Sequence, residues 1–385
     1  MTPLVTQTDA VPTTTPDTTA APTGASVGLF DPITLRGRAF RNRLWVAPMC
    51  QYSAELEDGV PTDWHLVHLG SLARGGAGAV IAEATSVTPE GRISPQDLGL
   101  WNDAQVEAFR PITAFIRSQG SVPGVQLAHA GRKASTFRPW SETQGTVPAD
   151  QGGWTTVAPS AVAFEGYDEP VALTTEAVGD LVEAFRAAAR RSVDAGFDLI
   201  ELHAAHGYLL HQFLSPLSNE RDDRYGGSLE NRARFLLEVV AAVRAEVGDE
   251  YPLLVRFSAT DWADGGWNED DTATVAAWAH DAGADLFDIS TGGLVAGVSI
   301  PVGLGYQVRF AEHVRTQGRV ETGAVGLIVG AEQANEVVAS GRADVVLMAR
   351  EFLRDPHFPL RAAAELGIEI DYTPSQYERA PFRVR

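Results

Sequence analysis

Short apolar runs alternate with longer amphipathic segments from Leu44 onward. Each short run is apolar at nearly every position, as expected for a strand that is covered on both faces. The longer segments have the spacing of helices, so the alternation is typical of β/α units and a parallel sheet. The predicted strands are residues 43–48, 78–84, 122–129, 197–205, 252–258, 284–290, 324–330 and 343–350. The predicted helices include residues 103–119, 176–195, 228–247, 270–282 and 331–340.

Eight such units predict an α/β fold in which the strands close into a TIM (β/α)8 barrel. Two short apolar runs around Arg36-Gly37-Arg38 predict an N-terminal β-hairpin that closes the N-terminal mouth of this barrel. The connection after the third strand spans residues 130–175, whereas an ordinary connection takes roughly 2 to 6 residues. Because long loops at the C-terminal face of a barrel usually serve the active site, we expect this loop to do so.

The 385-residue chain divides into three predicted parts. Residues 1–26 are rich in Thr, Pro and Ala, and they cannot bury enough apolar surface to offset the entropy lost on ordering, so we expect a disordered tail. Residues 27–370 form the single predicted barrel domain. Residues 371–385 form a C-terminal tail.

The charge balance argues against two classes of partner. Fifty acidic residues against thirty basic ones give a formal net charge of −20, which opposes binding to nucleic acids and anionic membranes. The chain has neither an apolar run of about 18 residues nor the pattern of a signal peptide.

Its single cysteine, Cys50, cannot form an internal disulfide, a four-thiolate zinc site or an iron–sulfur cluster. We therefore expect a cytoplasmic protein that binds neither nucleic acid nor membrane.

Polar residues at the carboxyl ends of barrel strands are the candidates for chemistry. Lys133 follows the third strand and is the only lysine in the chain, so it is the only side-chain amine available for a Schiff base. Arg256 and Arg350 are cations that could bind an anionic cofactor or form salt bridges at the barrel end. Barrels often bind phosphate in the loops after strands seven and eight, where Gly330, Ala349 and Arg350 lie.

A histidine pair follows the fourth strand and allows three interpretations. His203 and His206 could bind a metal, serve only the structure, or hydrogen-bond one substrate oxygen. A catalytic zinc site needs three protein ligands, and we expect Glu201 to point away from His203, so we predict no metal and favour the oxygen-binding role. Tyr208 could donate a proton, and Tyr52 is a second candidate phenol, although either ring could simply pack.

Motifs spread over nearly the whole barrel resemble those of a known family. They are, in chain order, APMCQY, GVQLAHAGRK, ELHAAHGYLLHQFLSPLSNERDDRYGGSLENR, VRFSATD and VLMARE. Their order and spacing resemble the Old Yellow Enzyme family of FMN-dependent ene-reductases, from about Leu29 to Arg379. The sequence QYER at residues 376–379 and four further residues are similar to the thermophilic-like subgroup: Cys50, Tyr52, His203 and His206.

The resemblance implies a bound FMN. Gln126 would hydrogen-bond the pyrimidine edge of the flavin, Arg256 would stabilise charge at its N1/C2 region, and Arg350 would bind the phosphate. Cys50 would tune the redox potential and would not act as a nucleophile. The residues expected to bind the cofactor are Ala47, Pro48, Met49, Cys50, Ala84, Gln126, Arg256, Gly330, Ala349 and Arg350.

The resemblance also implies a reaction, the reduction of activated C=C bonds in enones, enals, maleimides and nitroalkenes. His203 and His206 would bind the carbonyl of the α,β-unsaturated substrate while the flavin transfers hydride to its β-carbon. Tyr208 would protonate the α-carbon from the opposite face. NAD(P)H would reduce the flavin by stacking in the same pocket.

Three further residues are implied to contact substrate. Tyr52 would touch it directly, and Lys133 would line the pocket in an unassigned role. Arg379 resembles an arginine that enters the site of a neighbouring subunit, which implies a homodimer or homotetramer. The chain departs from the family pattern at Ala349, where a glycine often precedes the phosphate-binding arginine, and it continues past QYER to residue 385.

Two other functions fit the residues alone. A Schiff-base barrel enzyme of aldolase type would use the amine of Lys133 for covalent catalysis. A barrel without catalytic activity would bind flavin or another ligand and nothing more.

Overall fold

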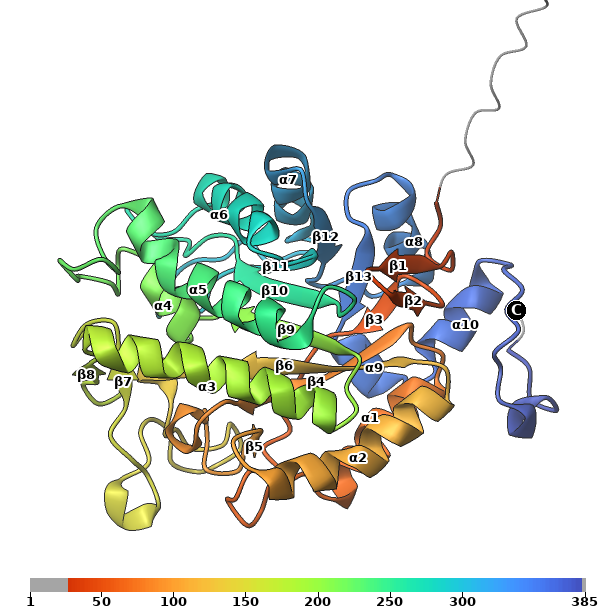
Figure 1. Ribbon diagram of the computed structural model, residues 1–385. Coiled ribbons are helices and arrows are strands. Elements are labelled where there is room, and N and C mark those ends of the chain that lie inside the picture. The colour runs from red at the N-terminus through yellow and green to blue at the C-terminus, as the bar shows by residue number, and fades with distance from the viewer. Residues whose placement is uncertain (1–26, 383–385) are drawn as a thin grey trace, which may run out of the picture.

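The computed structural model describes residues 27–382, so the predicted disordered tail at residues 1–26 lies outside the described residues. Eight parallel strands close into a barrel, because β3 pairs with both β13 and β4, which confirms the TIM-barrel prediction (Figure 1). The short strand β5 (Leu98–Gly99) extends the sheet beside β4. The barrel strands are β3 (Leu44–Val46), β4 (Ala79–Ser86), β6 (Val122–Ala128), β9 (Leu199–Ala204), β10 (Leu253–Ser258), β11 (Leu286–Ser290), β12 (Glu321–Ala324) and β13 (Val345–Met348).

Helices surround the barrel. Several begin at a side chain that accepts a hydrogen bond from the first turn, as Asn102, Ser228 and Asn268 do. Within residues 27–382, no helix combines the length and apolar character needed to cross a membrane. The helices are α1 (Asp63–Arg74), α2 (Asp103–Ser118), α3 (Thr175–Asp194), α4 (Leu209–Leu214), α5 (Leu229–Val247), α6 (Glu269–Asp281), α7 (Val308–Gly318), α8 (Ala331–Ala339), α9 (Arg350–Arg354) and α10 (Phe358–Glu365).

The seventh barrel strand lies earlier than its apolar pattern predicts. We expected residues 324–330, but β12 ends at Ala324. Gly326 and Leu327 have φ angles of +113° and +50°, which an extended strand does not allow. The apolar run at 325–329 is therefore a loop at the carboxyl end of β12.

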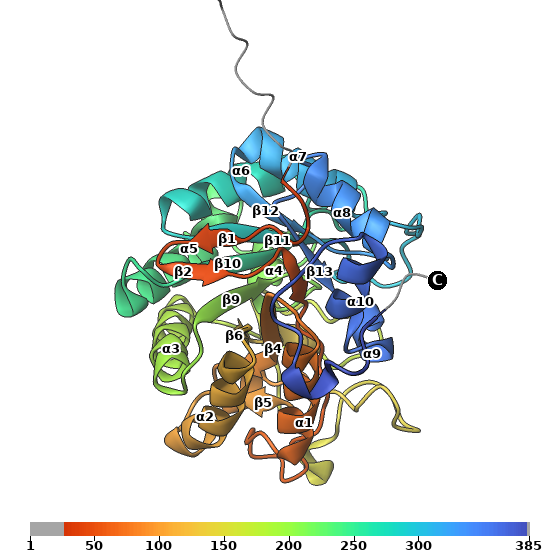
Figure 2. The same cartoon turned by 90° about the vertical axis from the view of Figure 1, so that its right-hand side faces the viewer.

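The predicted N-terminal hairpin is present. Strands β1 (Ile33–Leu35) and β2 (Arg38–Phe40) pair antiparallel and lie across the amino end of the barrel (Figure 2). Arg36 forms an ion pair of 2.5 Å with Asp285, just before β11, and Arg38 forms one of 2.8 Å with Asp198, just before β9. The hairpin thus seals the end of the barrel at which the strands begin.

The barrel interior changes from apolar to polar along the strands. Because alternate residues of a strand face the same side, each strand contributes every second side chain to the interior. At the hairpin end these side chains form one apolar cluster, which includes Trp45, Ile81, Leu199, Leu254 and Leu286. Nearer the carboxyl ends, the buried inward positions are polar: Gln126, Glu201, His203, Arg256, Ser258, Asp288 and Ser290.

The long connection after β6 lies at the carboxyl ends of the strands. It contains the short parallel pair β7 (Val157–Ala158) and β8 (Val171–Ala172), and α3 follows it. In Figure 1 this loop lies at the end of the barrel toward which β6 points, and the C-terminal segment lies at the other end. The prediction of a long loop at this face is confirmed.

The seal at the hairpin end can be tested with one core substitution. Phe40 is fully buried and stacks on Trp45 with ring centroids 4.5 Å apart. Phe40→Ala should lower the free energy of unfolding by about 3–5 kcal/mol in urea denaturation, because it leaves a cavity in the apolar cluster. Leu56, which is 84% exposed, provides the control, and Leu56→Ala should change that free energy by less than about 0.5 kcal/mol. Equal effects of the two substitutions would contradict the proposed seal.

Candidate active site

The two predicted histidines meet at the carboxyl end of β9. The rings of His203 and His206 are perpendicular, with centroids 5.2 Å apart. His203 Nε2 lies 3.4 Å from His206 Nδ1, so both nitrogens face one small space. Burial, with Arg256 nearby, holds the pKa of each imidazole well below its usual value. Both rings are therefore neutral near pH 7.

The hydrogen bonds of the two rings indicate which nitrogen of each ring carries the proton. The backbone N–H of Ala205 donates to His203 Nδ1 at 3.3 Å, which leaves the proton of this neutral ring on Nε2. His206 Nε2 lies 2.9 Å from Ser290 Oγ, a hydroxyl that can donate or accept. Ser290 Oγ is also within 3.4 Å of Gln307 Oε1, to which it can donate. When it donates to His206 instead, the proton of His206 resides on Nδ1, and an oxygen placed beside both nitrogens would receive two N–H donors.

The turn that carries His206 and Tyr208 is held tightly by its backbone. His206 has a φ of +58°, its N–H donates to Ser258 Oγ at 2.9 Å, and its carbonyl accepts from Lys133 Nζ at 2.9 Å. Lys133 Nζ also donates to the carbonyl of Gly293 at 2.8 Å. Position 207 must be glycine, because a Cβ there would lie 2.3 Å from that same carbonyl oxygen.

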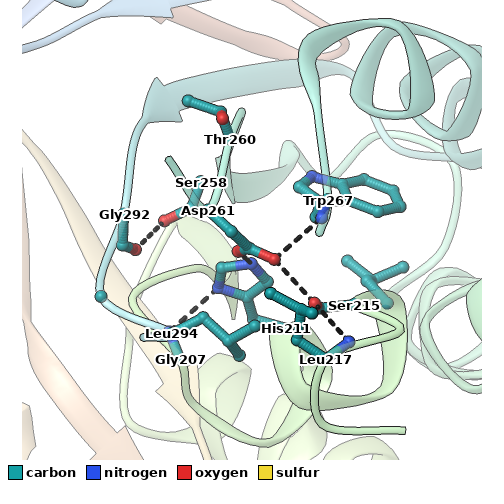
Figure 3. Close-up of polar contacts among 12 residues, drawn as sticks. Gly207, His211, Ser215, Leu217, Ser258, Thr260, Asp261, Trp267, Gly292 and Leu294 are labelled. Carbon is teal, nitrogen blue, oxygen red and sulfur yellow. Dashed lines mark hydrogen bonds and ion pairs between the residues drawn. The ribbon is translucent and has the colours of Figure 1, made fainter. Parts of the chain in front are cut away.

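A buried histidine–aspartate pair anchors the same turn (Figure 3). His211 Nδ1 accepts from the N–H of Gly207 at 2.9 Å, and its Nε2 lies 2.9 Å from Asp261 Oδ1. Asp261 also accepts from Ser215 Oγ at 2.6 Å and from the N–H of Trp267 at 2.8 Å. Burial alone would raise the pKa of Asp261, but His211 and these donors hold it below its ordinary value. The turn is thus tied to α4 and to the loop after β10.

The contacts of Lys133 differ from those of an open pocket residue. Its ammonium group binds two backbone carbonyls and lies 4.6 Å from the ring centroid of Phe164 and 5.3 Å from that of Tyr208. Burial, with Arg132 nearby, lowers the pKa of Lys133 to about 8. An amine engaged in this way supports the turn and is badly placed to attack a carbonyl substrate, which argues against the Schiff-base hypothesis.

Tyr208 sits beside the histidines. Its ring meets His203 edge to face with centroids 4.9 Å apart. Burial raises the pKa of Tyr208 well above its usual value, and burial with the Asp97 and Glu83 carboxylates does the same for the Cys50 thiol. Tyr208 is therefore a protonated phenol, and Cys50 is not a thiolate nucleophile. Both belong to one cluster with Tyr52, Ala84, Ile93, Ala128, Ala130, Ala134 and Trp154.

Beneath the histidines lies a buried polar group whose members come from four strands, β6, β9, β10 and β11. Gln126 Nε2 donates to Glu201 Oε1 at 2.7 Å, and Arg256 Nε lies 2.8 Å from Asp288 Oδ2. The expectation that Glu201 points away from His203 is wrong, because residues two apart on a strand share a face. Within residues 27–382, no hydrogen bond involves Gln126 Oε1 or the terminal nitrogens of Arg256.

These residues fit FMN. The amide oxygen of Gln126 and the guanidinium of Arg256 offer an acceptor and donors to the polar edge of a flavin, next to a surface of small side chains such as Ala84 and Ala128. Arg350 is exposed and forms no ion pair with any other described residue, so its charge is available to a phosphate. Arg350 also helps to line a cavity of about 70 Å³.

That cavity lies between the loops that follow β12 and β13. It is lined by residues 325–329 and 347–351 together with Arg354, so Ala349 takes part, as expected, and Gly326 lies in the loop. Gly330 is not among the lining residues and caps α8. Gly326, four positions earlier, is the glycine that lines this cavity.

The structure does not bring Arg379 to the site of its own chain. Arg379 is exposed in the C-terminal segment, which packs at the amino end of the barrel through a 3.0 Å hydrogen bond from Asn42 Nδ2 to Tyr372 Oη. Tyr377 in the same segment contacts His357, with ring centroids 5.5 Å apart. A cavity of about 760 Å³ lies there, between α10 and the segment.

Several residues of the site were not predicted from the sequence. Ser258 and Ser290 are the last residues of β10 and β11. They could have been predicted in the same way as His203, as polar residues at the carboxyl ends of barrel strands. Asp288 lies two residues before Ser290 and faces the interior by the same alternation. The pair of His211 and Asp261 gives no sequence signal, because its members lie on different β/α units.

Comparisons with known proteins identify the family of this chain. Residues 28–369 match the NADH:flavin oxidoreductase / NADH oxidase family. The NADPH dehydrogenase of Bacillus velezensis is 48% identical over 353 residues, which cover 91% of this chain and 98% of that protein. The NADPH dehydrogenase of Listeria monocytogenes serovar 1/2a is 48% identical with the same coverage.

Solved structures show the same likeness. Morphinone reductase is 29% identical with a TM-score of 0.74, and the match covers 92% of this chain and 94% of that one. The Old Yellow Enzyme homologue from Zymomonas mobilis is 29% identical with a TM-score of 0.73 and the same coverage. The chain therefore belongs to the NADH:flavin oxidoreductase / NADH oxidase family and is an FMN-dependent, NAD(P)H-using oxidoreductase of the Old Yellow Enzyme type.

Proposed function

We propose that this oxidoreductase reduces the activated C=C bond of α,β-unsaturated carbonyl compounds and related alkenes, namely enones, enals, maleimides and nitroalkenes. The observation that carries the proposal is the pair of neutral imidazoles whose facing nitrogens lie 3.4 Å apart beside Tyr208. Two N–H donors aimed at one point suit the oxygen of a polarised carbonyl, and a phenol next to them suits proton delivery to the neighbouring carbon.

FMN, held by residues such as Gln126 and Arg256, would supply hydride chemistry for the β-carbon, with NAD(P)H as the source of the hydride. His203 and His206 bind the carbonyl oxygen and withdraw electron density from the alkene. Tyr208 holds a proton at its hydroxyl and delivers it to the α-carbon. Since the turn that carries His206 and Tyr208 is held by Lys133 and His211, both groups are in position before substrate arrives.

We also propose how the remaining predicted residues act. Tyr52 contacts substrate from the same cluster as Tyr208. Arg379 acts in a neighbouring subunit of a homodimer or homotetramer, since its own segment packs at the far end of the barrel. Lys133 supports the turn and does not touch substrate. The residues proposed to contact FMN are Ala47, Pro48, Met49, Cys50, Ala84, Gln126, Arg256, Ala349 and Arg350, with Gly326 in place of Gly330.

The visible spectrum of the purified holoenzyme tests this function in one anaerobic cuvette. NADPH should bleach the flavin absorbance, and cyclohexenone should restore it without oxygen, because hydride then passes from the flavin to the alkene. The control is cyclohexanone, which lacks the alkene and should leave the flavin bleached. A flavin that NADPH bleaches but that no enone, enal, maleimide or nitroalkene reoxidises would overturn the proposal.

The role of Tyr208 is testable with the loss of a single oxygen. Tyr208→Phe should slow reoxidation of the flavin by the enone roughly 100-fold, since a positioned acid contributes about 10²–10⁴-fold. Flavin content and the rate of reduction by NADPH should not change. The matched control is Tyr251→Phe, which removes another buried phenol, bound to the Phe197 carbonyl at 2.8 Å, and should keep the full rate. Wild-type reoxidation in Tyr208→Phe would contradict the assignment.

A further inference from the structure

The buried polar group beneath the histidines contains more acidic side chains than basic ones. Arg256 is its one cation, and Glu201 and Asp288 are its two carboxyl groups, all of them buried. The Arg256 Nε to Asp288 Oδ2 distance of 2.8 Å pairs this arginine with Asp288. Glu201 accepts one hydrogen bond, from the Gln126 amide, and its Oε2 is buried without a hydrogen-bond partner among the described residues. The Asp288 oxygens also lack a hydrogen-bond partner there, so what distinguishes Asp288 is its ion pair with Arg256.

Full ionisation would leave one uncompensated negative charge inside the barrel. Such a charge is unfavourable at a dry site, so one of the two carboxyl groups binds a proton more tightly than a carboxyl group in water does, and it ionises only at a more alkaline pH. Glu201 is the better acceptor, because Asp288 already has the direct ion pair. Burial first and the Asp288 carboxylate second raise the pKa of Glu201, while Arg256 and the Gln126 amide oppose them.

The surroundings of Glu201 contain few other groups that could titrate in its place. Gln126 faces it from β6, Arg256 from β10 and Asp288 from β11, and His203 lies two residues further along β9. Of these, Gln126 does not titrate, Arg256 stays charged, and His203 is neutral. Toward the hairpin the neighbours are apolar, including Leu199 and Leu254. Proton exchange in this group is therefore confined to the two carboxyls.

We propose that Glu201 is a redox-linked proton site, which takes up a proton at Oε2 when the flavin above Gln126 and Arg256 is reduced. This inference rests on the proposed placement of FMN. Reduction by NAD(P)H transfers one hydride, with its two electrons, and adds one negative charge next to Arg256. That negative charge partly offsets the positive charge of Arg256, so Arg256 stabilises the ionised carboxylates less. A proton from solvent then binds to Oε2 of Glu201 and forms an O–H bond. No covalent bond within the protein breaks.

The proposal predicts how the midpoint potential of the bound flavin varies with pH. One proton per two electrons gives a slope of about 30 mV per pH unit, and two protons give about 60 mV. Below the pKa that Glu201 has in the oxidised enzyme, this residue is already protonated and adds nothing to the slope. Above that pKa it takes up the second proton. The wild-type plot should therefore steepen about twofold on the alkaline side of neutrality.

The experiment is potentiometric titration of three holoenzymes between about pH 6.5 and 9.5. Wild type should show the break in slope, and Glu201→Gln, which keeps the side-chain size and an acceptor for Gln126, should show a single shallow slope. The control is Glu321→Gln, a change at the exposed start of β12 in the same barrel, which should retain the break. A wild-type plot without a break, or a break that persists in Glu201→Gln, would overturn the inference.

A second readout remains available if Glu201→Gln binds flavin poorly. The reduced-minus-oxidised infrared spectrum of wild type at alkaline pH should contain a new carbonyl band of a protonated carboxylic acid, and its absence would overturn the inference. Neither measurement uses an alkene. An enzyme that shows the break but reduces no alkene would refute the proposed function alone, and one that reduces enones without the break would refute the role of Glu201 alone.

Discussion

Alternation along the strands is the constraint on which the rest of this structure depends. Every second residue of a barrel strand points inward, and the inward residues of all eight strands share one narrow interior. At the hairpin end that interior is apolar, and Phe40 and Trp45 close it. Toward the carboxyl ends it becomes polar and then opens at the histidine pair. The candidate site thus lies between the hairpin end of the barrel, which is closed, and the carboxyl ends of the strands, where the long loop lies.

Charges inside such a barrel must be matched within the barrel. Asp288 pairs with Arg256, and Asp261 pairs with His211, so each of these two buried acids has a partner from a neighbouring β/α unit. Within residues 27–382, the Lys133 ammonium group binds two carbonyl oxygens and lies over two aromatic rings. These contacts converge on the turn at residues 206–208 and fix it from several sides. Rigidity at this turn is what places two hydrogen-bond donors and one phenol around a single small space.

The sequence was sufficient to predict the barrel, the hairpin, the long loop and the histidine pair, because each depends on local pattern or on position at a strand end. It failed at β12, where the apolar run at 325–329 has the composition of a strand but two left-handed residues. It left the role of Lys133 unassigned, because the two carbonyls that its ammonium group binds, those of His206 and Gly293, lie far along the chain. Partners from distant units, such as Asp261 for His211, have no local signal.

The central claim is that the flavin lies across the small residues at the strand ends, with its polar edge at Gln126 and Arg256. A crystal structure of the FMN-bound enzyme tests it most directly. The account predicts contacts from the Gln126 amide oxygen and from the Arg256 terminal nitrogens to the flavin ring, with its phosphate near Arg350. A flavin bound in the cavity beside α10, or one that leaves Gln126 and Arg256 without contact, would contradict the account.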